Sequence, residues 1–246
     1  VDLASCIEAL TWSQGYDCPN GVSLELCTTA IITGTEHNDL LELLRSTGPY
    51  WPYGAPNSDG AIANLDATVV QALLTVGTQD STSESVHLYF RVGHTPVDHN
   101  YLDIYDSVRP FQKAMLVDFY ANNDVANMSM FEIQKANALS SAEFSWTTDE
   151  NTLHDEVLAL SSGLLDIVRN AEPNSDVQSD FEVELESIFA GDDFSSASEE
   201  AQDTMVIMHS VYHASDWYWD DVDASRGPGF WKKFGDALGV LGGAAL

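Results

Sequence analysis

The sequence is poor in basic residues. Nine Lys and Arg stand against 39 Asp and Glu, so the 246-residue chain has a formal net charge of −30. A surface of this sign repels nucleic-acid phosphates, and we expect no direct binding of RNA or DNA by the acidic body. The same charge makes the folded chain repel itself, which salt, cations, low pH or a basic partner would relieve.

Cysteine is absent after position 27. Cys6, Cys18 and Cys27 form an odd set that allows at most one internal disulfide, and their spacing fits no zinc-binding pattern. A free cysteine behaves as a small hydrophobic residue, so we predict buried free thiols. The redox compartment stays open.

Long hydrophobic runs and catalytic motifs are missing as well. The longest apolar runs fall well short of the roughly 20 residues that a membrane-spanning helix requires. No G-x-S-x-G, P-loop or G-x-G-x-x-G sequence occurs, so we predict that the protein is not an enzyme and has no cofactor. The chain begins at Val1, from which we expect a processed protein or an excised fragment.

The hydrophobic content of 44% is that of a globular protein, and its pattern predicts an α+β fold. Apolar residues alternate with polar ones over Ser85–Gly93, and short runs bounded by turn residues follow: Tyr101–Val108, Ala114–Ala121, Met128–Ile133 and Glu143–Trp146. These runs predict a central antiparallel sheet or β-sandwich over about residues 85–146, within a strand-rich core that we place at 85–148.

The regions on either side differ in pattern. Residues 1–84 predict a mixed region: a strand over Val22–Ile32 ending near Gly34, a short helix over Glu36–Leu44, and an aromatic loop with Tyr50, Trp51 and Tyr53. Over Ala61–Val76 the apolar spacing favours a helix, while the β-branched residues leave a strand open. Residues 149–225 predict an acidic helical region. Its helices are expected over Leu153–Val168, about Phe181–Phe189 and about Ser198–Tyr212, the last two entered through Ser or Asp caps.

Two groups of histidines are candidates for chemistry. His209 and His213 are four residues apart on an expected helix, the spacing of two zinc ligands, but Ser210 replaces the Glu of the metalloprotease motif. We favour two partly buried, hydrogen-bonded histidines. His94, Asp98 and His99 share a turn in which a carboxylate could orient a base, although turns are rich in such residues for geometric reasons.

Carboxylates crowd the segment Asp216–Asp223. Asp220, Asp221 and Asp223 are candidate ligands for Ca²⁺, which prefers hard oxygen ligands, although the ligand order of an EF-hand is absent. We favour a solvated acidic turn whose aromatic residues face inward.

The last 21 residues oppose the rest of the chain in charge. Arg226, Lys232 and Lys233 outnumber Asp236, so residues 226–246 carry +2 and residues 1–225 carry −32. After a Gly-Pro-Gly break, apolar residues recur every three or four positions, with cations towards the other face. This pattern is typical of a helix lying in a membrane interface. The residues expected to contact the membrane are Phe230, Trp231, Lys232, Lys233, Phe234, Leu238 and Leu241. The alternative is a terminal helix packed on its own domain.

This tail resembles cationic antimicrobial peptides and the membrane-lytic C-terminal peptide of capsid proteins from small non-enveloped RNA viruses, such as nodaviruses and tetraviruses. The Asn-Ala or Asn-Gly cleavage dipeptide of those capsid proteins does not precede it. The resemblance implies a capsid or capsid-surface protein of the virion that assembles with other copies and contacts membrane through residues 226–246. The alternative is a soluble acidic extracellular or halophilic enzyme or binding protein with a His/Asp site.

Overall fold

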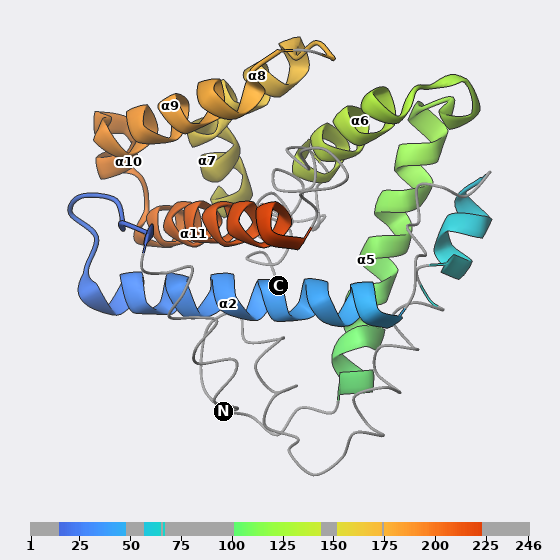
Figure 1. The fold of residues 1–246 in the computed structure, drawn as a ribbon, viewed down its shortest axis with the longest axis horizontal. Helices are drawn as coiled ribbons and strands as arrows, with labels where there is room; N and C mark the ends of the chain where they lie inside the picture. The colour runs from blue at the N-terminus through green and yellow to red at the C-terminus, as the bar shows by residue number, and fades with distance from the viewer. Residues whose placement is uncertain are drawn as a thin grey trace.

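The protein is described by a computed structural model that covers residues 15–47, 57–64, 66, 101–143, 152–173 and 175–222. Within these ranges 83% of the residues are helical and no strand is present. Figure 1 shows the helices, which are α2 (Leu24–Thr47), α5 (Tyr101–Asn122), the 3₁₀ turn η3 (Val125–Asn127), α6 (Met130–Glu143), α7 (Thr152–Leu160), α8 (Ser162–Asn170), α9 (Val177–Ala190), α10 (Asp192–Ser196) and α11 (Glu199–Val222).

The predicted central sheet is wrong, because the described part of it is helical. Runs expected as separate strands over Tyr101–Val108 and Ala114–Ala121 belong to the single helix α5, and the run over Met128–Ile133 enters α6. Ser129 and Glu132 form a capping box at the start of α6, in which each backbone N–H donates to the other side chain. The alternating segment Ser85–Gly93 and the residues from Phe144 to Trp146 lie outside the described ranges.

The strand predicted over Val22–Ile32 is also wrong, since these residues enter α2, which continues through the expected short helix Glu36–Leu44. Threonine favours strands, but here Thr28, Thr29 and Thr33 each donate the side-chain hydroxyl to the carbonyl four residues earlier. Gly34, expected near a turn, is buried within the helix.

The helices predicted in the C-terminal region are confirmed, except that the single helix expected over Leu153–Val168 is divided in two. The pattern over Leu153–Val168 forms α7 and α8, which meet at the buried Ser161. Asp176 caps α9 by accepting from the backbone of Ser179, and the Ser198 hydroxyl accepts from the backbone of Ala201 at the start of α11.

Helix α11 is the central element of the described fold. It lies beside α2 along most of its length, and Figure 1 shows both helices running in the same direction. Small residues bring them close: the Ser210 hydroxyl donates to Ala30 O at 2.7 Å, and Asn38 Nδ2 donates to Ala214 O at 2.8 Å. On its other side α11 packs against α7 and contacts α9 through the rings of Phe181 and Tyr212. Burial of this helix on several sides is what encloses its two histidines.

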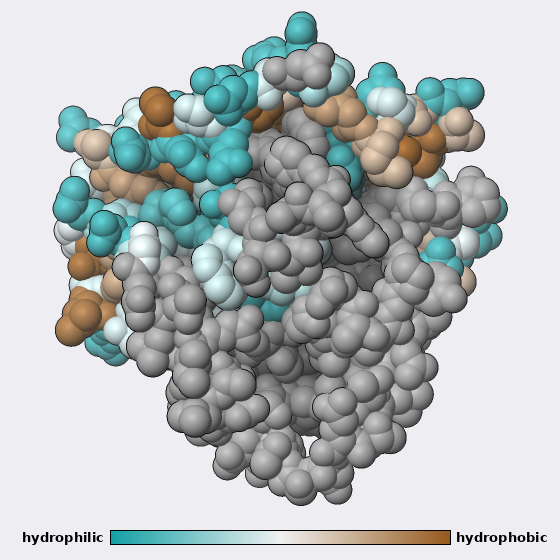
Figure 2. All heavy atoms as spheres, in the orientation of Figure 1, coloured by the Kyte–Doolittle hydropathy of each residue, from teal (hydrophilic) through white to brown (hydrophobic). Residues whose placement is uncertain are grey.

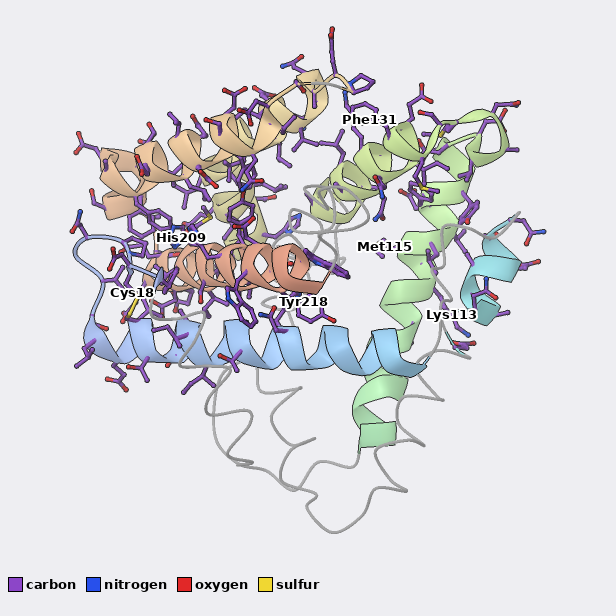
Figure 3. The ribbon with its side chains drawn as sticks, viewed as in Figure 1. Cys18, Lys113, Met115, Phe131, His209 and Tyr218 are labelled. Carbon is purple, nitrogen blue, oxygen red and sulfur yellow. A yellow bond between two sulfur atoms is a disulfide. The ribbon has the colours of Figure 1, made fainter. Side chains whose placement is uncertain are left out.

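A second, smaller core lies where α5 meets α6 and the short helical segment at residues 58–64. Its buried residues are Ala61, Leu116, Phe119 and Ile133. Lys113 on α5 forms an ion pair with Asp66 at 3.3 Å, so this segment is tied to α5 by charge as well as by packing (Figure 3).

The prediction of free thiols is wrong for two of the three cysteines. Cys18 and Cys27 form a disulfide that joins the segment 15–23 to the first turn of α2. The odd count allowed one such bridge but could not choose the pair. In the described residues no helix has the length and apolar character needed to cross a bilayer.

The start of α11 provides a test of this packing. Glu156 on α7 accepts hydrogen bonds from the backbone N–H and the hydroxyl of Ser198, which caps α11. We expect Glu156→Gln to lower the free energy of unfolding by about 1–2 kcal/mol, because charge-assisted hydrogen bonds are lost while side-chain size is kept. Urea denaturation followed by circular dichroism measures the change.

The matched control is Glu186→Gln, which makes the same charge change at an exposed position of α9. It removes the same amount of self-repulsion without touching a cap, and we expect a change within about 0.5 kcal/mol. Equal effects of the two substitutions would show that the cap contributes nothing beyond net charge.

Candidate functional site

The described residues bring together a hydrogen-bonded chain of three side chains, Tyr16, His209 and His213. The Tyr16 hydroxyl lies 2.9 Å from Nδ1 of His209, and Nε2 of His209 lies 3.2 Å from Nε2 of His213. The Tyr16 ring also packs in a tilted orientation against both imidazoles, with its centre 5.4 Å from that of His209 and 5.5 Å from that of His213. We call these three residues the Tyr–His–His chain.

The sequence predicted part of this arrangement. His209 and His213 do share one face of α11, as their spacing of four requires. Tyr16 could not be found from the sequence, because it is 193 residues away and reaches His209 only through the fold. Figure 3 shows His209 and Cys18 at the same end of the α2–α11 pair, where the disulfide holds the segment that carries Tyr16.

Burial determines the protonation of both rings. His209 is 9% exposed, and burial together with the neighbouring His213 lowers its pKa from 6.5 to about 3. Burial also lowers the pKa of His213, although Asp216 and Glu182 oppose that shift. Burial raises the pKa of the Tyr16 hydroxyl. All three groups are therefore neutral near pH 7.

The apolar wall around the chain comes from α9. The Phe189 ring lies edge-on to His209 at 5.0 Å between ring centres, and Phe189 packs in turn on Phe194 of α10. Gln178 of α9 donates to Asp216, which lies one turn beyond His213. The site is thus enclosed by apolar rings at His209 and opens towards carboxylates at His213.

A metal ion would need more ligands than this pair. Among the described residues no group of three or more His, Cys, Asp or Glu side chains could hold a metal. The two Nε2 atoms, one protonated and one not, satisfy each other as a hydrogen bond in the neutral state. The arrangement matches the partly buried, hydrogen-bonded pair favoured by the sequence.

The remaining candidates are only partly described. The acidic turn predicted over Asp216–Asp223 is wrong as far as Val222, because these residues continue α11. Asp220 and Asp221 lie in that helix, while Asp223 falls outside the described ranges, and the calcium hypothesis stays a prediction. Also outside them lie His94, Asp98 and His99, the aromatic loop with Tyr50, Trp51 and Tyr53, and the whole tail 226–246.

A second feature is the acidity of the surface that precedes the tail. From Asn170 to Ser225 the chain contains fifteen Asp and Glu and no Lys or Arg. Figure 2 shows hydrophilic residues across the outer side of α9 and α10. The exposed acids of this surface are Glu172, Asp176, Asp180, Glu182, Glu186, Asp192, Asp193, Glu199 and Glu200. We call this set the acidic surface.

Comparisons of the chain with models of protein families, with curated proteins and with solved structures give no match.

Proposed function

We propose that the protein is an acidic helical body that carries a membrane-binding segment, residues 226–246, and holds that segment by charge until it is released. The observation that carries the proposal is the abrupt change of charge at Arg226. Fifteen acids without a base precede it, and a segment of charge +2 with helical apolar spacing follows. Opposite charges on one chain attract, whereas the tail's cations would also favour an anionic bilayer.

The described helices support the first half of this proposal. The acidic surface is exposed on α9, α10, the first turn of α11 and the loop before α9 that carries Glu172 and Asp176. The basic side chain nearest in sequence, Arg169, is already bonded to Asp166 at 2.7 Å. Unbalanced charge on these helices favours binding of a cationic segment, and high salt or protonation of the carboxylates would weaken it.

Assembly into a non-enveloped particle is a further part of the proposal. One feature that favoured it was a strand-rich centre, and this feature is lost because residues 101–143 are helical. The tail and the lack of catalytic motifs still favour it. Electron micrographs of the purified full chain test this part, since regular particles would support it and a monomer alone would remove it.

The membrane part is tested by dye release from vesicles. A synthetic peptide of residues 229–246 should release dye from vesicles of mixed zwitterionic and anionic phospholipids. The full chain should bind the same vesicles more strongly at pH 5 than at pH 7.5. Replacing both Phe230 and Trp231 by Ser should weaken full-chain binding at least about tenfold, because each buried aromatic side chain contributes about 1.5–3 kcal/mol.

The matched control is Val183→Ser on α9, which removes an apolar side chain that is 65% exposed on the body. It should leave vesicle binding unchanged. An inert peptide would remove the membrane function, and equal losses from both changes would show that binding does not depend on the tail.

A further inference from the structure

We propose that the Tyr–His–His chain is an acid-sensitive latch, which holds the disulfide-bonded segment 15–23 against α11 at neutral pH and releases it when both imidazoles take up protons. This latch does not rest on the proposed membrane function, and its test uses no membrane.

The number of protons on the two imidazoles determines whether the Tyr–His–His chain stays closed. With one proton between the two Nε2 atoms, His209 and His213 attract each other at 3.2 Å. A first additional proton can be accommodated on His213 if His209 changes tautomer and donates from Nδ1 to the Tyr16 hydroxyl, which then accepts. A second additional proton places two N–H groups and two positive charges face to face, so the two imidazoles must separate. Because the Tyr16 ring packs on both imidazoles, at 5.4 and 5.5 Å between ring centres, their separation displaces Tyr16 and the segment that carries it.

The surrounding charges set the order in which the rings protonate. Asp216, on the same helix, and Glu182, on α9, favour a proton on His213. For His209 the neighbouring titratable group is His213 itself, which opposes a proton, and α9 contributes the apolar ring of Phe189. Segment 15–23 contributes Tyr16, which is neutral, and Asp17, which is exposed to solvent. His209 is therefore the ring that resists protonation while the latch is closed.

Release of the segment makes His209 easier to protonate. Once Tyr16 leaves, water reaches the rings, and the pKa of His209 returns towards the ordinary value of 6.5 from about 3. A group with a lowered pKa in the closed state favours the open state as the pH falls below 6.5. A complete return to 6.5 sets the upper limit, because Phe189 and His213 remain beside His209: between pH 7.5 and pH 5 the open population should rise by at most about 30-fold from His209 alone.

The disulfide reports this opening. Cys18 lies two residues from Tyr16, and both bridged cysteines are half-buried, so release of the segment exposes the bond. The experiment measures the rate at which a bulky phosphine reduces the Cys18–Cys27 bond in the full chain at pH 7.5, 6 and 5. Each rate is divided by that of a small reference disulfide at the same pH. We expect this ratio to rise by about 10-fold to 30-fold from pH 7.5 to pH 5.

Variants separate the latch from general effects of acid. His209→Gln combined with His213→Gln keeps donors and acceptors but removes both titrations, and its ratio should not change with pH. His154→Gln is the matched control: His154 is another buried histidine with a lowered pKa, on α7, and this variant should behave like the wild type. All these chains share the same carboxylates, so self-repulsion affects them equally.

A wild-type ratio that does not change with pH would overturn the proposal, as would an unchanged rise in the double variant. If the double variant fails to show the helical circular dichroism of the wild type, Tyr16→Phe decides instead. It keeps the ring and removes the hydroxyl that bonds to His209 and Ser210 of α11, so it should speed reduction several-fold at pH 7.5. Reduction of Tyr16→Phe at the wild-type rate would overturn the latch.

Discussion

Phe181→Ala is expected to lower the free energy of unfolding by about 3–5 kcal/mol, the usual cost of truncating a fully buried aromatic side chain. Phe181 is 1% exposed on α9, and its ring lies 4.8 Å from that of Tyr212, which is 1% exposed on α11. Truncation leaves a cavity between the two helices and removes the ring contact. Urea denaturation in moderate salt, which reduces self-repulsion, measures the loss.

The same helix provides the matched control. Val183 is two residues further on and faces solvent, so Val183→Ala should change the free energy of unfolding by less than about 0.5 kcal/mol. Both substitutions shorten an apolar side chain in α9 and leave the charge unchanged. Similar small effects from both would mean that α9 does not bury this face against α11, and the enclosure of His209 by Phe189 would then be in doubt as well.

The C-terminal helices were predictable from the sequence because their signals agree. Apolar residues recur every three or four positions in α7, α8 and α11, and Asp176 and Ser198 supply the caps that end the preceding loops. Such consistency between periodicity and capping is what makes a segment predictable without its neighbours. The ends were less certain, and α11 extends ten residues beyond the expected end at Tyr212.

Helix α5 shows why the central region was mispredicted. Pro110 lacks a backbone N–H and usually ends a helix or kinks it, so it separated two short apolar runs that each resembled a strand. The structure places Pro110 inside a continuous 22-residue helix. In this helical form, α5 buries Leu116 and Phe119 against Ala61 and Ile133. That packing is a tertiary contact, which neither run contains by itself.

The candidate site was predictable only where one helix carries it. Spacing alone placed His209 and His213 on a common face, and the choice of a hydrogen-bonded pair over a metal site followed from the missing Glu at Ser210. The partners from other elements were not predictable: Tyr16, Phe189 and Glu182 reach the histidines through the packing of α9 and the disulfide. The latch could therefore not be predicted from the sequence, because only the fold brings its residues together.

Removal of the Cys18–Cys27 bridge is expected to lower the free energy of unfolding by about 2–3 kcal/mol. The bridge closes a loop between residues nine apart, and the loss of loop entropy in the unfolded chain is of this size for a loop so short. The comparison is best made in a Cys6→Ser background, where no third thiol can form another pair. Urea denaturation of that chain with and without Cys18→Ser and Cys27→Ser measures the difference.

A double-mutant cycle with Tyr16→Phe then tests whether the bridge and the latch act on the same segment. The disulfide fixes segment 15–23 to α2, and the Tyr16 hydroxyl fixes it to His209 on α11. Without the bridge, holding Tyr16 in place costs more conformational entropy, so its hydroxyl should contribute less stability. We expect the combined variant, which lacks both the bridge and the hydroxyl, to lose less free energy of unfolding than the sum of the two separate losses, by at least about 0.5 kcal/mol. Additive losses would mean that the disulfide and the Tyr16–His209 hydrogen bond stabilise the segment independently. Reduction of the bridge would then leave the contribution of that hydrogen bond unchanged.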